Sequence, residues 1–175
     1  MNETSTSACT DDPTESGRWS RRDSIVDTIT RIFWYTDERR WADLIDLFAD
    51  SVHYDYTGLT GGQPSRLSRA AIASTWRSAL EHLDATQHIV GNHVVELDGD
   101  AATVTAQFVA THVLGTASNA TCWTLGGNYC FQVGRGDGRW TVTAIRMTPV
   151  WSNGDAGIMD ATEPPDTTLR QGARP

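Results

Sequence analysis

Lysine is absent from the sequence, so all 14 positively charged residues are arginines, and 22 acidic residues outnumber them. The formal charge of −8 argues against a nucleic-acid-binding surface, because phosphate binding requires clustered positive charge. No hydrophobic run approaches the roughly 20 apolar residues of a membrane span. We therefore expect a cytoplasmic protein without nucleic-acid or membrane partners.

Cysteine is also scarce. The three cysteines, Cys9, Cys122 and Cys130, cannot all pair, and they lack the close spacing of a structural zinc site. We interpret them as reduced thiols. Internal repeats, heptads, a phosphate-binding glycine loop and metal-ligand motifs are missing as well, so we expect neither a metal nor a cofactor.

The length of 175 residues is enough for one domain with a single core. Both ends are rich in Ser, Thr, Asp, Pro and Gly and have few large apolar residues, which disfavours ordered structure. We expect a disordered tail over 1–20, a folded domain over 21–155 and a flexible tail over 156–175.

Helical periodicity occurs in three segments of the first half. A helix capped by Asp23 is predicted to end near Asp37, a shorter one to span 41–48, and a third to follow a cap at Ser68. The apolar residues that mark these helices are Ile25, Ile29, Ile32, Phe33, Trp41, Leu44, Ile45, Phe48, Ile72, Trp76, Ala79 and Leu80.

Strand patterns dominate the second half. A short strand is predicted over 51–57, and four long strands run from the third helix to Trp151, with turns at 98–100 and 134–138. Helices followed by hairpin-connected strands indicate an α+β fold. We expect a cone-shaped, curved, mostly antiparallel sheet wrapped around about three N-terminal helices, with a cavity between them.

Polar residues on inward faces are the candidates for chemistry. His112 continues the apolar face of a strand, and His88 begins the first long strand, where it could face the cone. Asp37 ends the first helix, where the dipole disfavours a carboxylate and makes an imidazole partner plausible. The alternatives are a hydrogen-bonded core histidine and a solvated helix end.

Tyrosines form a second candidate group. Tyr54 and Tyr56 share one face of the short strand, and Tyr129 lies on an apolar strand face. Each could instead anchor the core through its hydroxyl group. The remaining histidines, His53, His82 and His93, are expected at the surface.

Four short patterns, at 37–44, 54–56, 86–88 and 111–112, give the chain a family resemblance. Over about residues 23–151 it resembles scytalone dehydratase and the related polyketide cyclase-like branch of the nuclear transport factor 2-like superfamily. The resemblance implies that the helices and curved sheet enclose an active-site pocket.

The resemblance also implies roles for individual residues. Asp37 would orient His88, which removes a proton next to a carbonyl group, while Tyr56 holds that carbonyl through a water and His112 assists loss of hydroxide. Residues expected to contact the substrate are Tyr54, Tyr35, Phe108, Tyr129, Asn128 and Trp151.

Two positions depart from the dehydratase pattern. Thr36 stands where the dehydratases have a tyrosine, so either Tyr35 or Thr36 could face the pocket. A Ser and Asn pair on the fourth strand is replaced around residues 127–129, which predicts a different substrate.

A cofactor-independent dehydratase or cyclase acting on a polyketide-like or aromatic small molecule is the leading expectation, and the resemblance implies a homodimer or homotrimer. The alternatives are a non-catalytic ligand-binding or oligomerisation module and the small subunit of a ring-hydroxylating oxygenase. A bond between Asp37 and His88 facing an apolar pocket would favour the enzyme. Outward-facing side chains would favour the module, and a conspicuous apolar surface would favour the subunit.

Overall fold

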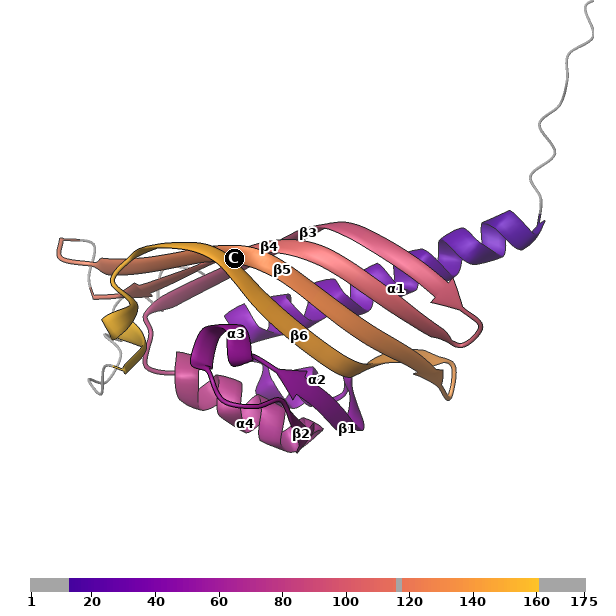
Figure 1. The fold of residues 1–175 in the computed structure, drawn as a ribbon, viewed down its shortest axis with the longest axis horizontal. Coiled ribbons are helices and arrows are strands. Elements are labelled where there is room, and N and C mark those ends of the chain that lie inside the picture. Colours follow the sequence, from indigo (N-terminus) through magenta and orange to yellow (C-terminus); the bar gives the residue numbers. More distant parts are fainter. Residues whose placement is uncertain (1–12, 116–117, 161–175) are drawn as a thin grey trace, which may run out of the picture.

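A six-stranded curved sheet arches over the helices in the computed structural model, which describes residues 13–115 and 118–160 (Figure 1). The strand order is β2-β1-β6-β5-β4-β3. All neighbours are antiparallel except β1 and β6, which are parallel. The strands are β1 (Phe48–Asp55), β2 (Ser65–Ser68), β3 (Ala85–Asp98), β4 (Ala101–Leu114), β5 (Thr121–Gly136) and β6 (Arg139–Gly154). The predicted α+β class and curved, mostly antiparallel sheet are confirmed.

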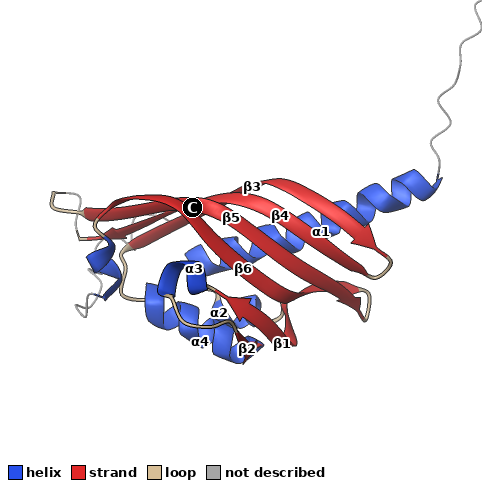
Figure 2. Cartoon of the chain, viewed as in Figure 1, coloured by secondary structure: helices blue, strands red, loops and turns tan. Residues whose placement is uncertain are grey.

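The helices gather on one side of this sheet (Figure 2). They are α1 (Pro13–Asp37), α2 (Trp41–Ile45), α3 (Thr57–Thr60), α4 (Arg69–Leu80) and the 3-10 helix η1 (Ala156–Asp160). Alternating residues of β4 and β5 are buried, as the period of a half-buried strand requires, and they share one apolar core with residues of α1 and α4. Fully buried members of this core include Ile25, Ile29, Ile72, Val104 and Phe131.

Local signals placed several boundaries correctly. The hydroxyl oxygen of Ser68 accepts a hydrogen bond from the Ala71 N–H at 3.2 Å and caps α4 as predicted. The two hairpin turns also form, with Gly99 at φ 57° and Gly138 at φ 77°. However, β5 continues to Gly136, so the second turn is shorter than the predicted 134–138 segment.

Other boundaries were wrong. Helix α1 begins at Pro13 and includes Asp23 as an interior residue, so Asp23 is not its cap, and the helix reaches into the predicted tail. The second helix ends at Ile45, because Phe48 pairs with Val142 of β6 instead of continuing the helical pattern. Strand β1 ends at Asp55, which leaves Tyr56 at the start of α3.

The beginning of the predicted C-terminal tail belongs to the fold. Ile158 in η1 is only 4% exposed, and the His82 Nε2 atom lies 2.8 Å from its carbonyl oxygen. Residues 1–12 and 161–175, which include Cys9, lie outside the described residues. Cys122 and Cys130 are free thiols, with Cys122 exposed. Among the described helices, none combines the length and apolar character needed to cross a membrane.

Candidate active site

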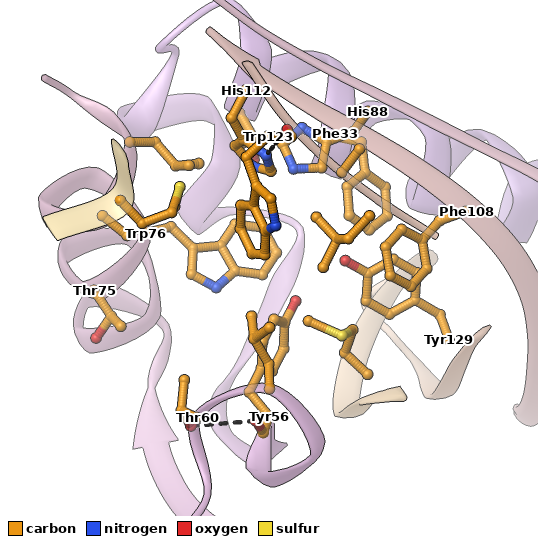
Figure 3. A pocket seen from close by; sticks show the side chains of 18 of the residues that line it. Phe33, Tyr56, Thr60, Thr75, Trp76, His88, Phe108, His112, Trp123 and Tyr129 are labelled. Atoms are coloured by element: carbon orange, nitrogen blue, oxygen red, sulfur yellow. Dashed lines mark hydrogen bonds between the residues drawn. The ribbon is translucent and has the colours of Figure 1, made fainter. Parts of the chain in front are cut away.

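An open pocket of about 170 Å³ lies between the concave face of the sheet and the helices. Aromatic and aliphatic side chains form most of its wall, and a few polar groups converge on it (Figure 3). This combination is typical of small-molecule sites. The residues that line the pocket include Phe33, Thr36, Tyr54, Tyr56, Trp76, His88, Phe108, His112, Trp123, Tyr129, Met147 and Met159.

Asp37 and His88 meet at one wall of this pocket. The His88 Nδ1 atom lies 2.7 Å from Asp37 Oδ1, and the backbone N–H of His88 donates to Asp37 Oδ2 at 2.7 Å. Because the carboxylate accepts at Nδ1, the hydrogen of neutral His88 is fixed there and Nε2 keeps its lone pair. These bonds also offset the unfavourable position of Asp37 at the end of α1.

A second layer holds Asp37 from behind. The Thr86 hydroxyl donates to Asp37 Oδ1 at 2.9 Å, and Arg39 Nη1 donates to Thr86 Oγ1 at 2.7 Å. A guanidinium group can only donate hydrogen bonds, so the Thr86 oxygen accepts from Arg39. The Thr86 hydroxyl hydrogen therefore points toward Asp37. The chain Arg39–Thr86–Asp37–His88 therefore has one consistent direction of hydrogen donation.

Backbone geometry brings Arg39 to this position. Its φ of 58° lies in the left-handed region, and the Arg40 N–H donates to the Tyr35 carbonyl at 2.8 Å, closing the end of α1. Glycine usually occupies such a position, and a residue with a side chain there costs about 1–2 kcal/mol. The Arg39 side chain offsets this strain through further bonds to the carbonyls of Thr36 and Leu80, at 3.0 and 2.9 Å.

His112 lies beside His88 on the neighbouring strand. Thr86 and His112 are register partners, so His88 and His112 are diagonal neighbours on one face, with ring centroids 5.5 Å apart. The His112 Nδ1–H donates to the Trp123 carbonyl at 3.3 Å. Burial, followed by repulsion from His88, lowers the pKa of His112 to about 4. His112 is therefore neutral near pH 7 and presents Nε2 as an acceptor.

Three tyrosines supply hydroxyl groups to the pocket. The rings of Tyr54 and Tyr56 stack with centroids 4.4 Å apart, and Trp76 Nε1 donates to the Tyr54 hydroxyl at 3.1 Å. Burial raises the pKa of Tyr54 to about 12 and that of Tyr56 and Tyr129 well above the usual value. All three remain protonated near neutral pH. The hydroxyl groups of Tyr56 and Tyr129 hydrogen-bond to each other, so one hydroxyl hydrogen of this pair is left for a ligand.

Seven of the ten site residues predicted from the sequence line the pocket or lie directly behind its wall. His88, His112, Tyr54, Tyr56, Phe108 and Tyr129 line it, and Asp37 lies behind His88. Tyr35, Asn128 and Trp151, which were expected to contact the substrate, do not line it.

Each of the three misplaced residues faces elsewhere for a geometric reason. Tyr35 lies on another side of α1, where Arg40 covers its ring at 4.4 Å, whereas the adjacent Thr36 faces the pocket. Asn128 is exposed because its neighbour Tyr129 occupies the inward face of β5. Trp151 is 48% exposed and packs over Gly126 on the outer face of the sheet.

Sequence reasoning missed Trp76, Trp123 and Met159 as pocket residues. Trp76 was recognised only as a core residue of a helix. Trp123 pairs with His112 across β4 and β5, which an alignment of the two strand patterns could have indicated. Met159 follows Ile158, and this apolar pair was an overlooked signal within a polar segment.

The other histidines do not line this pocket. His53 is exposed as predicted, but His82 and His93 are partly buried, which corrects the surface assignment. Among residues 13–115 and 118–160, no group of three His, Cys, Asp or Glu side chains is placed to hold a metal ion.

Comparison with known proteins supports the fold and the family. The sequence model of the SnoaL-like domain matches residues 18–146. No curated protein sequence matches the chain.

Solved structures share the same architecture. The Kfla4162 protein from Kribbella flavida is 23% identical, with a TM-score of 0.76 over 82% of this chain and 99% of its own. A candidate scytalone dehydratase from Novosphingobium aromaticivorans is 16% identical, with a TM-score of 0.68 over 79% of this chain and 89% of its own. The β subunit of a candidate aromatic-ring-hydroxylating dioxygenase from the same organism is 15% identical, with a TM-score of 0.61 over 77% and 92%. At these identities the likeness establishes the fold alone.

Proposed function

The chain belongs to the SnoaL-like domain family, and on this premise we propose that it is an acid–base enzyme, a dehydratase or cyclase. Its substrate is a small polyketide-like or aromatic molecule that carries an acidic C–H next to a carbonyl group. The observation that carries the proposal is the 2.7 Å contact between Asp37 and His88 at the wall of an apolar pocket.

His88 is the proposed general base. With Nδ1–H donated to Asp37, the Nε2 lone pair is free to accept the proton. Asp37 then stabilises the imidazolium that forms, as an acid behind a histidine does in other acid–base sites. Such a base contributes roughly 10²–10⁴-fold to the rate. The proton transfer itself needs no cofactor.

The hydrogen-bonded pair of Tyr56 and Tyr129 is the proposed donor to the oxygen of the enolate, with one hydroxyl donating to the substrate and supported by the other. Their raised pKa values keep both hydroxyl groups protonated while negative charge develops on the substrate. Fixed donors in a low-dielectric pocket stabilise such charge more than water does. Removing a donor of this kind costs about 10²–10³-fold in rate in other enzymes.

The role of His112 differs from the one implied by the family resemblance. Because its Nδ1–H is bound to the Trp123 carbonyl and its pKa is lowered to about 4, it is poorly suited to donate a proton. We assign it the role of an acceptor that orients a hydroxyl group of the substrate through Nε2.

Cavity size limits the part of the substrate that is enclosed. The pocket of about 170 Å³ is similar to an apolar cavity of about 150 Å³ that accommodates benzene in another protein. One ring therefore fits inside, and larger substrates extend through the mouth.

The test is turnover of a panel of cyclic β-hydroxy ketones by His88→Ala and wild-type protein, with folding checked by circular dichroism. His53→Ala is the matched control, because His53 is exposed and outside the pocket. We expect His88→Ala to lose at least about 100-fold in kcat/KM and the control to retain its activity. Full activity in a folded His88→Ala protein refutes the base assignment.

Self-association through the outer face of the sheet is a separate proposal. Ile89, Val109, Gly126 and Trp151 are successive register partners across four strands, and the three large side chains among them are 62%, 38% and 48% exposed. Apolar surface of this kind favours a protein partner, and we propose a second copy of the chain. Sedimentation of wild-type and Trp151→Glu protein tests this, with a shift toward monomer expected for the variant. Partner binding as an oxygenase subunit would instead leave the isolated chain monomeric.

A further inference from the structure

The indole N–H of Trp123 is a buried hydrogen-bond donor that the proposed acid–base mechanism does not use. Trp123 is only 7% exposed and lines the pocket. In Figure 3 its ring nitrogen is turned toward the middle of the pocket. None of the residues within 13–115 and 118–160 accepts a hydrogen bond from it.

Other tryptophans of the domain show what a bonded indole looks like. Trp41 Nε1 donates to Glu81 Oε2 at 2.8 Å, and Trp76 Nε1 donates to the Tyr54 hydroxyl at 3.1 Å. A buried indole N–H usually finds such a partner. At Trp123 the indole N–H faces the open pocket where such a partner would normally lie. An oxygen atom of a bound ligand can therefore accept its hydrogen bond.

Trp123 and His112 form one continuous part of the wall. Their rings stack with centroids 5.2 Å apart and an interplanar angle of 29°. The Trp123 carbonyl also holds the Nδ1–H of His112. This bond leaves Nε2 of His112 as an acceptor, while the indole of Trp123 offers a donor.

We propose that Trp123 Nε1–H and His112 Nε2 together form a hydroxyl-binding subsite of the pocket. A hydroxyl group is both a donor and an acceptor, so it satisfies both atoms at once, whereas an ether or a carbonyl oxygen satisfies only the indole. The substrate therefore carries a hydroxyl group on the ring or chain that lies against this wall. The inference rests on the proposed function only in taking an organic alcohol as the ligand.

Trp123 is thus a specificity-determining residue. A pocket built to hydrogen-bond a hydroxyl rejects an analogue that lacks it, because the buried polar groups would remain unpaired. Trp123 also keeps His112 in the tautomer that the subsite requires. Substituting the Trp123 side chain leaves that carbonyl bond available, so the two contributions can be separated.

Binding of simple probes tests the subsite without any turnover. We would titrate benzyl alcohol, benzyl methyl ether and toluene into wild-type, Trp123→Phe and Trp140→Phe protein. Trp140 is the matched control, since it is 6% exposed and lies near the opposite end of the sheet, outside the pocket. All three probes are smaller than the pocket and differ mainly in hydrogen-bonding capacity.

The expected result is a selective loss. Affinity of Trp123→Phe for benzyl alcohol falls by about 3–10-fold, the range of one hydrogen bond, while affinity for toluene changes less than about twofold. Trp140→Phe binds all probes as the wild-type chain does. Equal losses for benzyl alcohol and toluene, or no saturable binding of benzyl alcohol to the wild-type chain, overturn the proposal.

A measurement on the wild-type protein tests the subsite without depending on correct folding of the variant. In a ¹⁵N-labelled sample, saturating benzyl alcohol should move the indole N–H resonance of Trp123 downfield, and toluene should not. An unmoved resonance at saturation contradicts the subsite. Because both experiments measure binding, failure of the subsite leaves the His88→Ala turnover test untouched, and loss of the enzyme proposal leaves this test valid.

Discussion

Asp37 Oδ1 lies 2.7 Å from His88 Nδ1 although the two residues are 51 positions apart in the sequence. The contact joins the last residue of α1 to the beginning of β3, two elements that pack along each other. A carboxylate at the end of one helix and an imidazole on the sheet thus form a single acid–base unit.

Thr86 should influence the catalytic rate of the Asp37–His88 pair without contacting the substrate. Replacing Thr86 with Val removes the hydroxyl that donates to Asp37 and accepts from Arg39. We expect about a fivefold fall in kcat with little change in KM, since one hydrogen bond is worth about 1 kcal/mol. Thr86→Ser retains the hydroxyl and should restore most of the activity. An unchanged kcat in Thr86→Val would show that the second layer does not position the base.

The lowered pKa of His112 predicts a pH dependence of stability. The unfolded chain takes up this proton near the ordinary value of 6.5, whereas the folded chain takes it up only at about 4. The free energy of unfolding should therefore fall as the pH decreases from 6.5 to 4, by up to roughly 3 kcal/mol from this residue.

Urea denaturation at pH 7 and pH 4.5 measures this effect. A His112→Gln variant should lose less stability between the two values than the wild-type chain does, and the exposed His53→Gln serves as control. Parallel pH profiles for wild-type and His112→Gln protein would contradict a buried, neutral His112.

Gly127 marks a place where the sheet has no room for a side chain. A Cβ atom there would overlap the Thr148 carbonyl oxygen and lie 2.9 Å from Pro149 Cα, both backbone atoms. Gly127→Ala should destabilise the fold by at least about 2 kcal/mol through overpacking. At Gly134 the nearest atom is the Thr143 methyl group at 3.5 Å, so Gly134→Ala should stay within about 1 kcal/mol of wild type. Thermal unfolding compares the two variants, and equal melting temperatures would refute the packing argument.

The 3-10 helix η1 closes one side of the pocket and should open when its anchor is lost. Ile158→Ala removes a buried side chain and should cost this segment about 2 kcal/mol of local stability. Hydrogen exchange should accelerate in residues 154–160, while Ile89→Ala, at an exposed position, leaves it unchanged. Unaltered exchange in that segment would mean that Ile158 does not hold η1 in place.

Periodicity made much of the fold predictable. The four long strands, the cap at Ser68 and the inward face of β4 follow from local patterns of apolar and turn residues. Phe48 shows the limit, because it satisfies a helical pattern but pairs with β6, a strand almost 100 positions later. Long-range pairing overrides local spacing in such cases.

The candidate site was likewise predictable only in part. Asp37, His88 and His112 could be predicted from faces and from family resemblance, since side chains alternate along a strand. The position of Arg39 could not be predicted, because it depends on a left-handed backbone conformation at the end of α1. Glycine usually marks such a conformation in a sequence, and here the residue is an arginine. Trp151 was misplaced because a β-bulge beside Gly126 shifts the register and directs the indole to the outer face.

Proton abstraction by His88 is the central claim, and hydrogen–deuterium exchange at carbon measures it most directly. The α-protons of 1-indanone, a ketone with an aromatic ring, would be followed by NMR in D₂O with wild-type, His88→Ala and Asp37→Asn protein. We predict exchange catalysed by the wild-type chain, loss of catalysis in His88→Ala and a fall of at least about tenfold in Asp37→Asn. Exchange at the same rate in wild-type and folded His88→Ala protein would contradict the account.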